Sequence, residues 1–397
     1  MKIGLLGMGT VGTGVLKVLS ENQEKISRLS DDELKVTHAV VNDVNKKRDV
    51  DVSGIKLTDD VEELLDADID IVIEVMGGIE NTRDILIKLL KQGKHVISAN
   101  KDMLAKHIDE LTETANENNV TFSYEASVAG GVPIIRTIES SLNSNDISEV
   151  MGILNGTTNY ILSKMTIDGW DYERALAEAQ AKGYAEADPT NDVEGIDALR
   201  KIVLLSRLAY HVKVDIDDVE TKGISNVDVN DLKTAKAEGL IMKLLGKSHF
   251  ENGKLEISVE PVLLPESHQL SGVNYEKNAV YVIGNAVGET MYYGAGAGSL
   301  ETASAVVSDL IHVASGGHKK NIVPEEKVEI QAGKSTKNYF IRTENTAGEV
   351  NQLGKDLKII SEENNTTFIT PKISADELNE LEKNLNIKAR YQVIGVE

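Results

Sequence analysis

Cysteine is absent from the chain of 397 residues. Its absence excludes a disulfide scaffold, a zinc or iron–sulfur site with cysteine ligands, and every mechanism that uses a cysteine nucleophile. Basic residues are outnumbered, 42 against 64 acidic ones, which gives a formal net charge of −22. Because a charge of this sign repels phosphate backbones and anionic lipid, we expect neither nucleic-acid nor membrane partners.

Long apolar runs are lacking as well. No run approaches the roughly 18 residues that a membrane-spanning helix requires. The short apolar N-terminus runs into glycines without a small-residue cleavage site, so we interpret it as a first strand rather than a signal peptide. Apolar residues make up 41% and charged residues 27% of the chain, which is typical of a soluble globular protein, and we expect it to be cytoplasmic. At roughly 100–200 residues per domain, the length predicts two or three domains.

Short apolar segments alternate with helical periodicity over the N-terminal third of the chain. Predicted strands lie at 2–6, 36–41, 69–75, 95–98 and 120–124, and predicted helices at 11–19, 59–66, 81–92 and 102–118. This alternation is typical of a doubly wound parallel sheet. The fold class is therefore α/β, with a Rossmann-type first domain.

The pattern changes near residue 146. Strands are predicted at 147–154, 239–246, 254–264 and 279–287, with helices at 156–166, 171–182 and 190–210. This indicates an α+β second domain. A helix at 299–314 follows a cluster of glycines, and we expect it to pack back on the first domain. The last segment, 338–395, has the βαββαβ order of a small ferredoxin-like unit.

A glycine motif, Gly-Met-Gly-Thr-Val-Gly at 7–12, joins the first strand to the first helix. In this context the first glycine allows a tight turn, the second lets a pyrophosphate approach, and the third lets helix pack on strand. The helix N-terminus supplies N–H donors to phosphate. The motif predicts a dinucleotide cofactor bound by Gly7, Gly9, Thr10, Val11 and Gly12, with a mere tight turn as the alternative.

The end of the second strand leaves the choice of cofactor open. Asp43 suits the ribose hydroxyl of NAD, whereas the basic residues Lys46, Lys47 and Arg48 suit the 2′-phosphate of NADP. The strand at 95–98 also ends in polar residues. Because ligands of open α/β sheets bind at the carboxyl ends of strands, Ser98, Asn100 and Lys101 are expected beside the cofactor.

The densest group of charged residues lies at 179–201. Asp197 and Lys201 are four residues apart and share a helix face, which continues through Leu204, Leu205 and Leu208. The apolar continuation favours a pair that faces a pocket over a pair on the surface. Carboxylates just before it, at Glu186, Asp188 and Asp192, suit a substrate with an ammonium group; the alternative is a favourable interaction with a helix dipole. We expect the helix to begin at Pro189 or Asp192.

Three segments together resemble one known family. EASVAGGVPII at 125–135, GILNGTTNYIL at 152–162 and GYAEADPTNDVEGIDALRK at 183–201 follow the glycine motif in the order of homoserine dehydrogenase. The resemblance covers about residues 1–320. It implies the reversible reduction of L-aspartate 4-semialdehyde to L-homoserine by NADPH or NADH, on the route to threonine, isoleucine and methionine. It also implies a homodimer or homotetramer.

The resemblance carries roles for individual residues. It implies Lys201 as the acid/base lysine with Asp197 as its companion, and Lys101 at the cofactor and the substrate hydroxyl. Glu186 would hold the substrate amino group, and we expect Asp192 and Asp197 to complete the substrate-binding site. Gly183 and Gly298 match cofactor contacts. A sodium-type monovalent cation would bind backbone carbonyls of Glu125, Val128, Gly130 and Val132; read alone, the glycines of this segment indicate a hinge.

The resemblance also implies a domain plan. Residues 1–134, completed by a helix at about 299–318, would bind NAD(P), and 135–298 would bind the substrate. A linker at 319–335 would lead to an ACT-like regulatory domain at 336–397. Two departures matter. Asn42 stands where family members often have arginine, and the ACT-like tail is short, with Ala347 and Gly348 in place of a proline-glycine turn. Threonine is therefore one candidate effector, and a dimer-stabilising or vestigial tail is the alternative.

Two other activities compete with this reading. A non-catalytic NAD(P)-binding sensor would not need Asp197, Lys201, Lys101 and Glu186, all of which are present. A phosphorylating semialdehyde dehydrogenase would need a nucleophilic cysteine, which the chain lacks.

Overall fold

The chain folds into two compact units in a computed structural model. The model describes residues 1–395 except 31, 318–321, 325, 326, 332–334, 355 and 364. The first unit comprises Met1–Ser144, Val203–Val214 and Gly294–Lys327. The second comprises Asn145–Ile202, Asp215–Tyr293 and Val328–Glu397.

The first unit contains a six-stranded sheet in the order β3-β2-β1-β4-β5-β6. All its pairings are parallel, which confirms the predicted Rossmann-type sheet. Its strands are β1 (Lys2–Leu6), β2 (Lys35–Val40), β3 (Lys56–Thr58), β4 (Ile71–Glu74), β5 (His95–Ser98) and β6 (Phe122–Ser123). The strand order reverses between β1 and β4, and open α/β sheets bind ligands at the carboxyl ends of strands at such a reversal.

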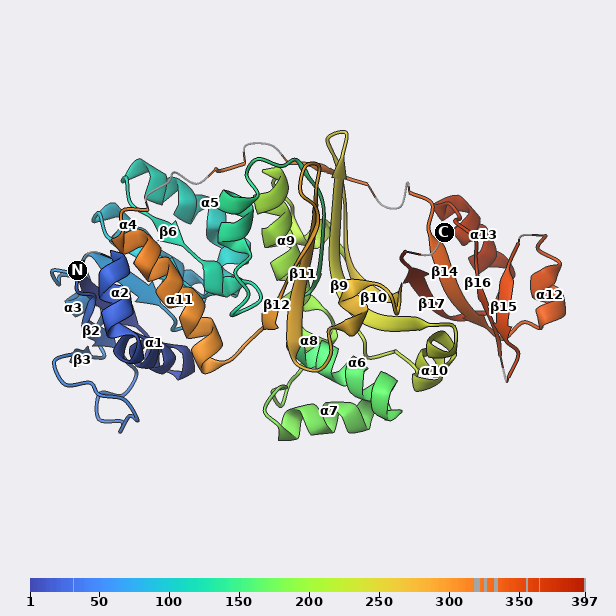
Figure 1. The fold of residues 1–397 in the computed structure, drawn as a ribbon, viewed down its shortest axis with the longest axis horizontal. Coiled ribbons are helices and arrows are strands. Elements are labelled where there is room, and N and C mark those ends of the chain that lie inside the picture. The colour runs from blue at the N-terminus through green and yellow to red at the C-terminus, as the bar shows by residue number, and fades with distance from the viewer. Residues whose placement is uncertain are drawn as a thin grey trace. The chain divides into compact units, whose positions relative to one another are not determined.

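Helices complete this unit. They are α1 (Thr10–Glu21), α2 (Gln23–Ser30), α3 (Val61–Leu65), α4 (Glu80–Lys91), α5 (Lys101–Glu117) and α11 (Ser299–Ala314). Although α11 is far away in the sequence, it lies beside α1 and α2 (Figure 1) and shares one core with β1, β4 and β5 through Ala303, Val306 and Leu310. The predicted return of this helix to the first domain is therefore correct. The polar helix α2 was not expected from its sequence.

The second unit contains a mixed eleven-stranded sheet, in which β8 and β13 pair only with β10. Its larger part consists of β7 (Ile147–Ile153), β8 (Glu220–Thr221), β9 (Leu240–Glu251), β10 (Lys254–Pro265), β11 (Lys277–Gly284), β12 (Gly288–Ala295) and β13 (Glu329–Ile330). The β9–β10 hairpin turns at Asn252 and Gly253, both at positive φ, as a two-residue hairpin turn requires. The predicted strand at 279–287 is wrong at its end, because the chain turns back there between β11 and β12.

The helices of this unit are α6 (Gly156–Asp168), α7 (Tyr172–Ala181), α8 (Thr190–Val193), α9 (Ile196–Tyr210) and α10 (Val229–Ala237). A single helix over 190–210 was the wrong prediction. Gly195 adopts φ of +81°, a left-handed conformation that ends α8 and starts a separate helix one residue later. Asp197 consequently lies in the first turn of α9. The last part of α9, from Val203 onward, belongs to the first unit.

The C-terminal segment has the predicted ferredoxin-like topology. Its elements are β14 (Asn338–Thr343), α12 (Ala347–Asn351), β15 (Lys358–Ser361), β16 (Thr366–Ile369), α13 (Ala375–Asn384) and β17 (Ile387–Val393). They form an antiparallel order β17-β14-β16-β15, and β17 continues the larger sheet by pairing with β10. Both helices begin with a capping box. The expected linker, 319–335, falls partly outside the described residues.

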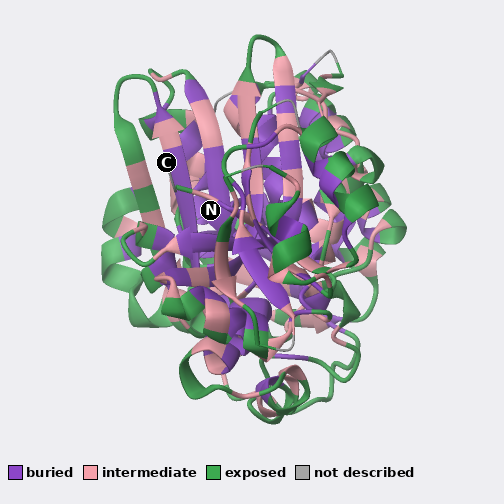
Figure 2. Cartoon of the chain, turned by 90° about the vertical axis from the view of Figure 1, so that its right-hand side faces the viewer, coloured by how far each residue is buried: buried purple, intermediate pink, exposed green. Residues whose placement is uncertain are grey.

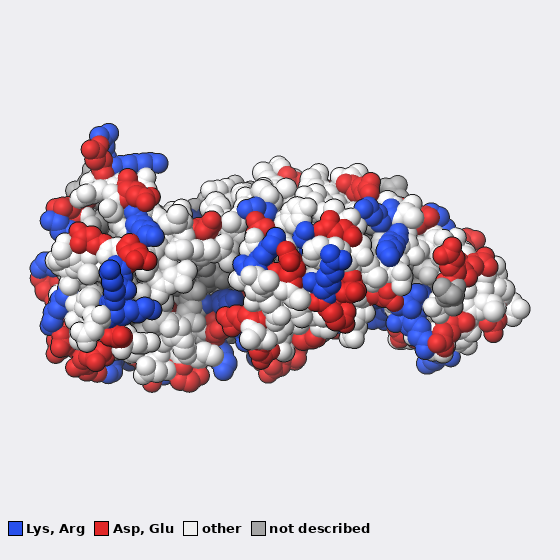
Figure 3. All heavy atoms as spheres, turned by 90° about the horizontal axis from the view of Figure 1, so that it is seen from below, with Lys and Arg blue, Asp and Glu red and all other residues white. Residues whose placement is uncertain are grey.

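Burial follows this architecture. Buried residues lie mainly on the strands, and exposed residues lie on the outer helix faces and hairpin tips (Figure 2). Acidic and basic side chains are interspersed over the face shown in Figure 3, where basic groups form no continuous stripe. Within the described residues, no helix combines the length and apolar character that a membrane span would need.

Candidate active site

The glycine motif forms a turn with no room for side chains at two positions. Gly7 adopts φ of +98°, and a Cβ there would lie 2.8 Å from the Cα of Met76. A Cβ on Gly12 would lie 2.3 Å from the carbonyl oxygen of Gly7. Gly9, in contrast, has no neighbouring atom within 4 Å of such a Cβ. The turn is therefore closed at its base and open at the position where a pyrophosphate would approach.

The first turn of α1 presents donors to that open space. The first main-chain bond runs from the N–H of Thr13 to the carbonyl of Gly9 at 2.9 Å, and within the described chain no side chain caps this helix. The N–H groups of Thr10, Val11 and Gly12 precede that bond, so they can donate to phosphate. These residues fit a bound dinucleotide.

Gly298 lies next to this turn. It precedes α11 at φ of +139°, and the hydroxyl of the following Ser299 donates to the carbonyl oxygen of Thr10 at 2.7 Å. Two segments that the sequence separates widely thus meet beside the glycine turn. The cofactor contact expected for Gly298 stays a prediction.

The loop after β2 is held by hydrogen bonds between its own residues. The carboxylate of Asp43 accepts the N–H of Asn45 at 2.8 Å. The guanidinium of Arg48 donates to the carbonyls of Asp43 at 2.8 Å and Lys46 at 2.7 Å. An acid and a base that would serve different cofactors therefore occupy the same exposed loop, and the choice between NAD and NADP stays open.

Polar groups meet at the ends of β4 and β5. Lys101 is the first residue of α5 and is partly exposed. The helix is capped by Asn100, whose side-chain oxygen accepts the N–H of Met103 at 3.2 Å. Ser98 is fully buried and donates to the carboxylate of Glu74 at 2.6 Å. Glu74 was not predicted as a site residue, because it lies within the predicted strand at 69–75 and belongs to none of the motifs.

In the second unit, Lys201 and Asp197 form a buried ion pair. The Nζ of Lys201 lies 2.7 Å from Asp197 Oδ2 and 2.7 Å from the carbonyl oxygen of Leu154. The two side chains are 9% and 2% exposed. The surface alternative is thereby excluded. Because burying two charges is costly, a pair at this depth calls for an explanation beyond stability.

Asn155 joins this pair and was not predicted. Its Nδ2 donates to Asp197 Oδ2 at 2.9 Å and to Asp192 Oδ1 at 2.7 Å. Its Oδ1 caps α6 by accepting the N–H of Thr158 at 2.8 Å. Asp192 is thus brought to Asp197 through one amide. The asparagine-glycine pair at 155–156 was the only signal, and it reads as an ordinary turn.

The other residues predicted between α7 and α8 lie apart from the ion pair's hydrogen bonds. Gly183 ends α7 at φ of +75°. Glu186 is exposed, and in the described part of the chain its carboxylate has no recorded partner. Asp188 accepts the hydroxyl and N–H of Thr190, and these bonds lower the pKa of its carboxyl. Asp188 therefore serves the start of α8.

The segment at 125–132 is buried and rich in main-chain acceptors. The Glu125 carboxylate accepts the N–H groups of Ile135 and Arg136 at 2.9 and 2.8 Å. Over these described residues no hydrogen bond is recorded to the carbonyls of Val128, Gly130 or Val132, so this donor set fits a hard cation. Among described side chains, no cluster of three His, Asp or Glu could hold a metal ion.

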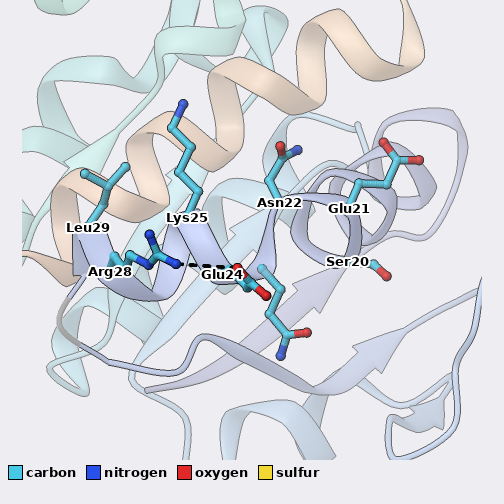
Figure 4. Close-up of a pocket in the computed structure, with 8 residues that line it drawn as sticks. Ser20, Glu21, Asn22, Glu24, Lys25, Arg28 and Leu29 are labelled. Carbon is cyan, nitrogen blue, oxygen red and sulfur yellow. Dashed lines mark hydrogen bonds and ion pairs between the residues drawn. The ribbon is translucent and has the colours of Figure 1, made fainter.

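One surface pocket lies away from these groups. It surrounds the turn between α1 and α2 and is lined by 20–25, 28 and 29, with Arg28 paired to Glu24 at 3.5 Å (Figure 4). This is the C-terminal end of α1, about 18 Å along a twelve-residue helix from the glycine turn. The pocket therefore lies far from the expected phosphates.

The class of protein is an NAD(P)-dependent oxidoreductase. It is defined by the Rossmann-type sheet, the glycine turn that fits a dinucleotide and the buried lysine–carboxylate pair. The family models agree. Residues 7–125 match "Homoserine dehydrogenase, NAD binding domain" and residues 133–311 match "Homoserine dehydrogenase". The chain belongs to the homoserine dehydrogenase family.

Individual relatives support this assignment. The chain is 49% identical over 314 residues to homoserine dehydrogenase of Bacillus subtilis, covering 79% of this chain and 72% of the relative. It resembles the crystal structure of a homoserine dehydrogenase from Thiobacillus denitrificans, with a TM-score of 0.90, 34% identity and coverage of 99% and 98%. It also resembles a hyperthermophilic archaeal homoserine dehydrogenase in complex with NADPH, with a TM-score of 0.67, 26% identity and coverage of 81% and 99%.

Proposed function

We propose that this chain catalyses the reversible NAD(P)H-dependent reduction of L-aspartate 4-semialdehyde to L-homoserine in the cytoplasm. The observation that carries the proposal is the buried pair of Lys201 and Asp197, with Nζ and Oδ2 2.7 Å apart. Membership of the family supports the choice of substrate. The proposed domains are 1–134 with about 299–318 for the cofactor and 135–298 for the substrate.

The residues have separate tasks in this reaction. The bound dinucleotide would supply the hydride. Negative charge develops on the aldehyde oxygen, and the Lys201 ammonium neutralises it and then donates a proton to form the hydroxyl. Asp197 and the carbonyl of Leu154 each accept a hydrogen bond from the ammonium and hold it in place. In the reverse direction, Lys201 accepts the hydroxyl proton.

Other residues bind and orient. Lys101, at the head of α5, would contact the cofactor and the substrate hydroxyl. Glu186 and Asp192 would bind the substrate ammonium, since both are acidic and lie near the start of the helices that lead to Lys201. Gly7, Gly9, Thr10, Val11, Gly12, Ser98, Gly183 and Gly298 complete the proposed cofactor site. Because Asp43 and Arg48 share one loop, the proposal includes both NAD and NADP.

A monovalent cation is a further part of the proposal. The carbonyls of Glu125, Val128, Gly130 and Val132 would hold a sodium-type ion at the segment that leaves the cofactor unit. Its expected effect is structural, since it would fix a segment in which Ala129 and Gly130 both adopt positive φ. Comparing thermal midpoints in sodium and in tetramethylammonium salts tests this site.

The C-terminal unit, 336–397, is proposed as an ACT-like regulatory domain, with threonine as the candidate effector. Its ferredoxin-like topology and its own apolar core support this proposal. We propose a homodimer or homotetramer. Light scattering of the purified chain, with and without threonine, tests the assembly.

Initial rates with homoserine and either NAD or NADP, with and without threonine, test the proposed reaction. We expect homoserine-dependent reduction of at least one cofactor. Tight cofactor binding without turnover would contradict the proposal and favour a non-catalytic sensor. Unchanged rates over a wide range of threonine would contradict the regulatory role alone.

A further inference from the structure

A fully buried carboxylate ends the fourth strand of the Rossmann-type sheet. Glu74 is 0% exposed, and it is the last residue of β4, next to β1 at the reversal of strand order. Burial raises the pKa of this carboxyl, and four hydrogen bonds oppose the rise. The other residues of β4 are apolar, as a strand buried on both faces requires. Glu74 is thus the polar exception at the ligand-binding edge.

The two oxygens of Glu74 bind two different segments. Oε1 accepts the N–H groups of Met76 at 2.9 Å and Gly77 at 3.2 Å, in the turn that follows β4. Oε2 accepts the hydroxyl of Ser98 at 2.6 Å, at the end of β5. One carboxylate therefore joins the carboxyl ends of two neighbouring strands.

The turn after β4 supports the glycine motif. The missing side chain of Gly7 leaves space that is occupied by main-chain atoms of Val75 and Met76, 2.8 Å from where a Cβ would lie. A shift of the turn after β4 would therefore displace Gly7 and the glycine turn proposed to bind the dinucleotide. By holding the N–H groups of Met76 and Gly77, Glu74 fixes the surface against which Gly7 packs.

The end of β5 leads to Lys101. The Ser98 hydroxyl, which donates to Glu74, accepts the N–H of Asn100 at 3.1 Å. Asn100 in turn donates to the carbonyl of Gly78 at 2.6 Å and caps α5, whose first residue is Lys101. The bonds run in a closed ring from Glu74 through β5 to Asn100 and back to the turn after β4. Lys101 comes directly after Asn100 in the sequence, so the ring fixes the main chain on which Lys101 stands.

Burying Glu74 in this ring of hydrogen bonds costs folding free energy, and a purely structural role does not explain that cost. A carboxyl group in a buried strand loses hydration, and an apolar residue of similar size often stabilises a fold equally well. Hydrogen bonds to main-chain N–H groups offset that loss only while the turn keeps its shape. The arrangement therefore exchanges stability for a fixed geometry at the edge that binds the cofactor.

We infer that Glu74 is a positioning residue that holds the turn after β4 and the start of α5 as one rigid wall of the nicotinamide side of the cofactor site, with Lys101 fixed on it. This inference rests on the proposed function for the roles of the cofactor and Lys101. It predicts that changes at Glu74 act on cofactor binding and turnover more than on binding of homoserine.

Three variants test it, with Kd for NADPH measured by fluorescence titration and kcat and KM measured in the homoserine reaction. Glu74→Ala removes the bonds from Met76, Gly77 and Ser98 to the carboxylate and should raise the Kd for NADPH and lower kcat, each by about tenfold or more. Glu74→Gln keeps an acceptor for Met76 and Gly77, and its amide can donate to the Ser98 oxygen, so it should restore most of the affinity. Ser98→Ala removes one bond and should give an intermediate loss. The KM for homoserine should change less than about twofold.

Ser30→Ala is the matched control. Ser30 is also a buried serine of the first unit, and its hydroxyl donates to the carbonyl of Ile26, one turn earlier in α2, at 2.9 Å. It should match the wild-type Kd and kcat. Folded Glu74→Ala with wild-type Kd and kcat would overturn the inference, as would a Gln variant as impaired as the Ala variant. If Glu74→Ala does not fold, Ser98→Ala decides by the same measurements.

The test separates this inference from the proposed function. If the wild-type chain shows no homoserine-dependent turnover, the proposed function fails. The NADPH titrations with Glu74→Gln, Ser98→Ala and Ser30→Ala then still decide whether Glu74 shapes the cofactor site.

Discussion

Asn155 and Lys201 donate to the same carboxylate oxygen. The Nδ2 of Asn155 lies 2.9 Å, and the Nζ of Lys201 lies 2.7 Å, from Asp197 Oδ2. Asn155 also binds Asp192 and caps α6. The starts of three helices therefore meet at one amide, and the orientation of the carboxylate that holds Lys201 depends on the residue that caps α6.

The first prediction concerns the charge at this point. Asn155→Asp keeps the cap of α6, because aspartate caps about as well as asparagine, but it places a third carboxylate beside Asp192 and Asp197. The added negative charge favours the protonated Lys201. For semialdehyde reduction, in which Lys201 donates the proton, we therefore expect the alkaline limb of the kcat–pH profile to move upward by about one unit.

Asp171→Ala is the control for this variant. It removes the cap of α7, where Asp171 accepts the N–H of Arg174 at 2.8 Å. It should lower stability by about 1 kcal/mol and leave the pH profile in place. An unshifted profile in Asn155→Asp would show that the carboxylates near residue 155 do not act on the reacting group.

The second prediction separates chemistry from cofactor binding. Lys201→Met removes the proposed proton donor and should lower kcat by about 10²- to 10⁴-fold. The Kd for NADPH should stay within about twofold, since the glycine turn belongs to the other unit. Lys222→Met changes a lysine in a surface pair with Glu220 and serves as control. Activity near wild type in Lys201→Met would contradict the proposal that Lys201 is the proton donor.

The fold could be predicted where local signals and tertiary structure agree. Apolar runs at 2–6 and 95–98 end in turn residues, and both became strands of the parallel sheet. Gly195 shows the opposite case. Its left-handed conformation divides 190–210 into two helices, yet the surrounding pattern is helical on both sides. Nothing in the order of apolar and polar residues marks which glycine adopts positive φ.

The site could be predicted where its residues are close in sequence. Asp197 and Lys201 are four residues apart, so helical geometry alone puts them on one face. Asn155 lies 42 residues before Asp197, and only the tertiary fold brings the cap of α6 to the first turn of α9. The proposed role of Glu74 likewise depends on its hydrogen bond with Ser98, which lies on another strand. Polar residues of this kind acquire their role from tertiary contacts, which periodicity does not encode.

The third prediction concerns the ion pair between Arg207 and Asp109. Arg207 donates from Nε at 2.9 Å to Asp109 Oδ1. The Arg207 side chain is 7% exposed, whereas that of Asp109 is 36% exposed and also meets Lys213 at 3.6 Å. Removing Asp109 and removing Arg207 should therefore lower the free energy of unfolding by different amounts. Asp109→Ala leaves a buried guanidinium without its carboxylate and should cost about 3 kcal/mol. Arg207→Met leaves a hydrated carboxylate and should cost about 1 kcal/mol.

Urea denaturation of both variants and of Lys2→Met measures this asymmetry. Lys2 forms an exposed pair with Asp68, so its removal should leave the free energy of unfolding unchanged within the error of the measurement. Equal losses in Asp109→Ala and Arg207→Met would contradict the argument from burial.

The fourth prediction concerns Asp309, which binds the N–H of Glu125 at 2.9 Å and pairs with Arg136. Burial raises the pKa of its carboxyl from 3.8 to about 6, and Arg136 opposes the rise. Between these two values the unfolded chain has lost the proton while the folded chain keeps it. Stability from this group is therefore present below pH 3.8 and is lost as the pH rises through 6, by about 3 kcal/mol in total.

Asp309→Asn cannot titrate, so the difference in unfolding free energy between wild type and this variant isolates the effect. We expect the wild type to lose about 1 kcal/mol relative to Asp309→Asn between pH 5 and pH 6, and the difference to stay level from pH 7 to 8. Asp84→Asn, which alters an exposed pair with Arg83, should show no such change. A difference that grew in favour of the wild type with rising pH would mean that Arg136, rather than burial, dominates the Asp309 carboxyl.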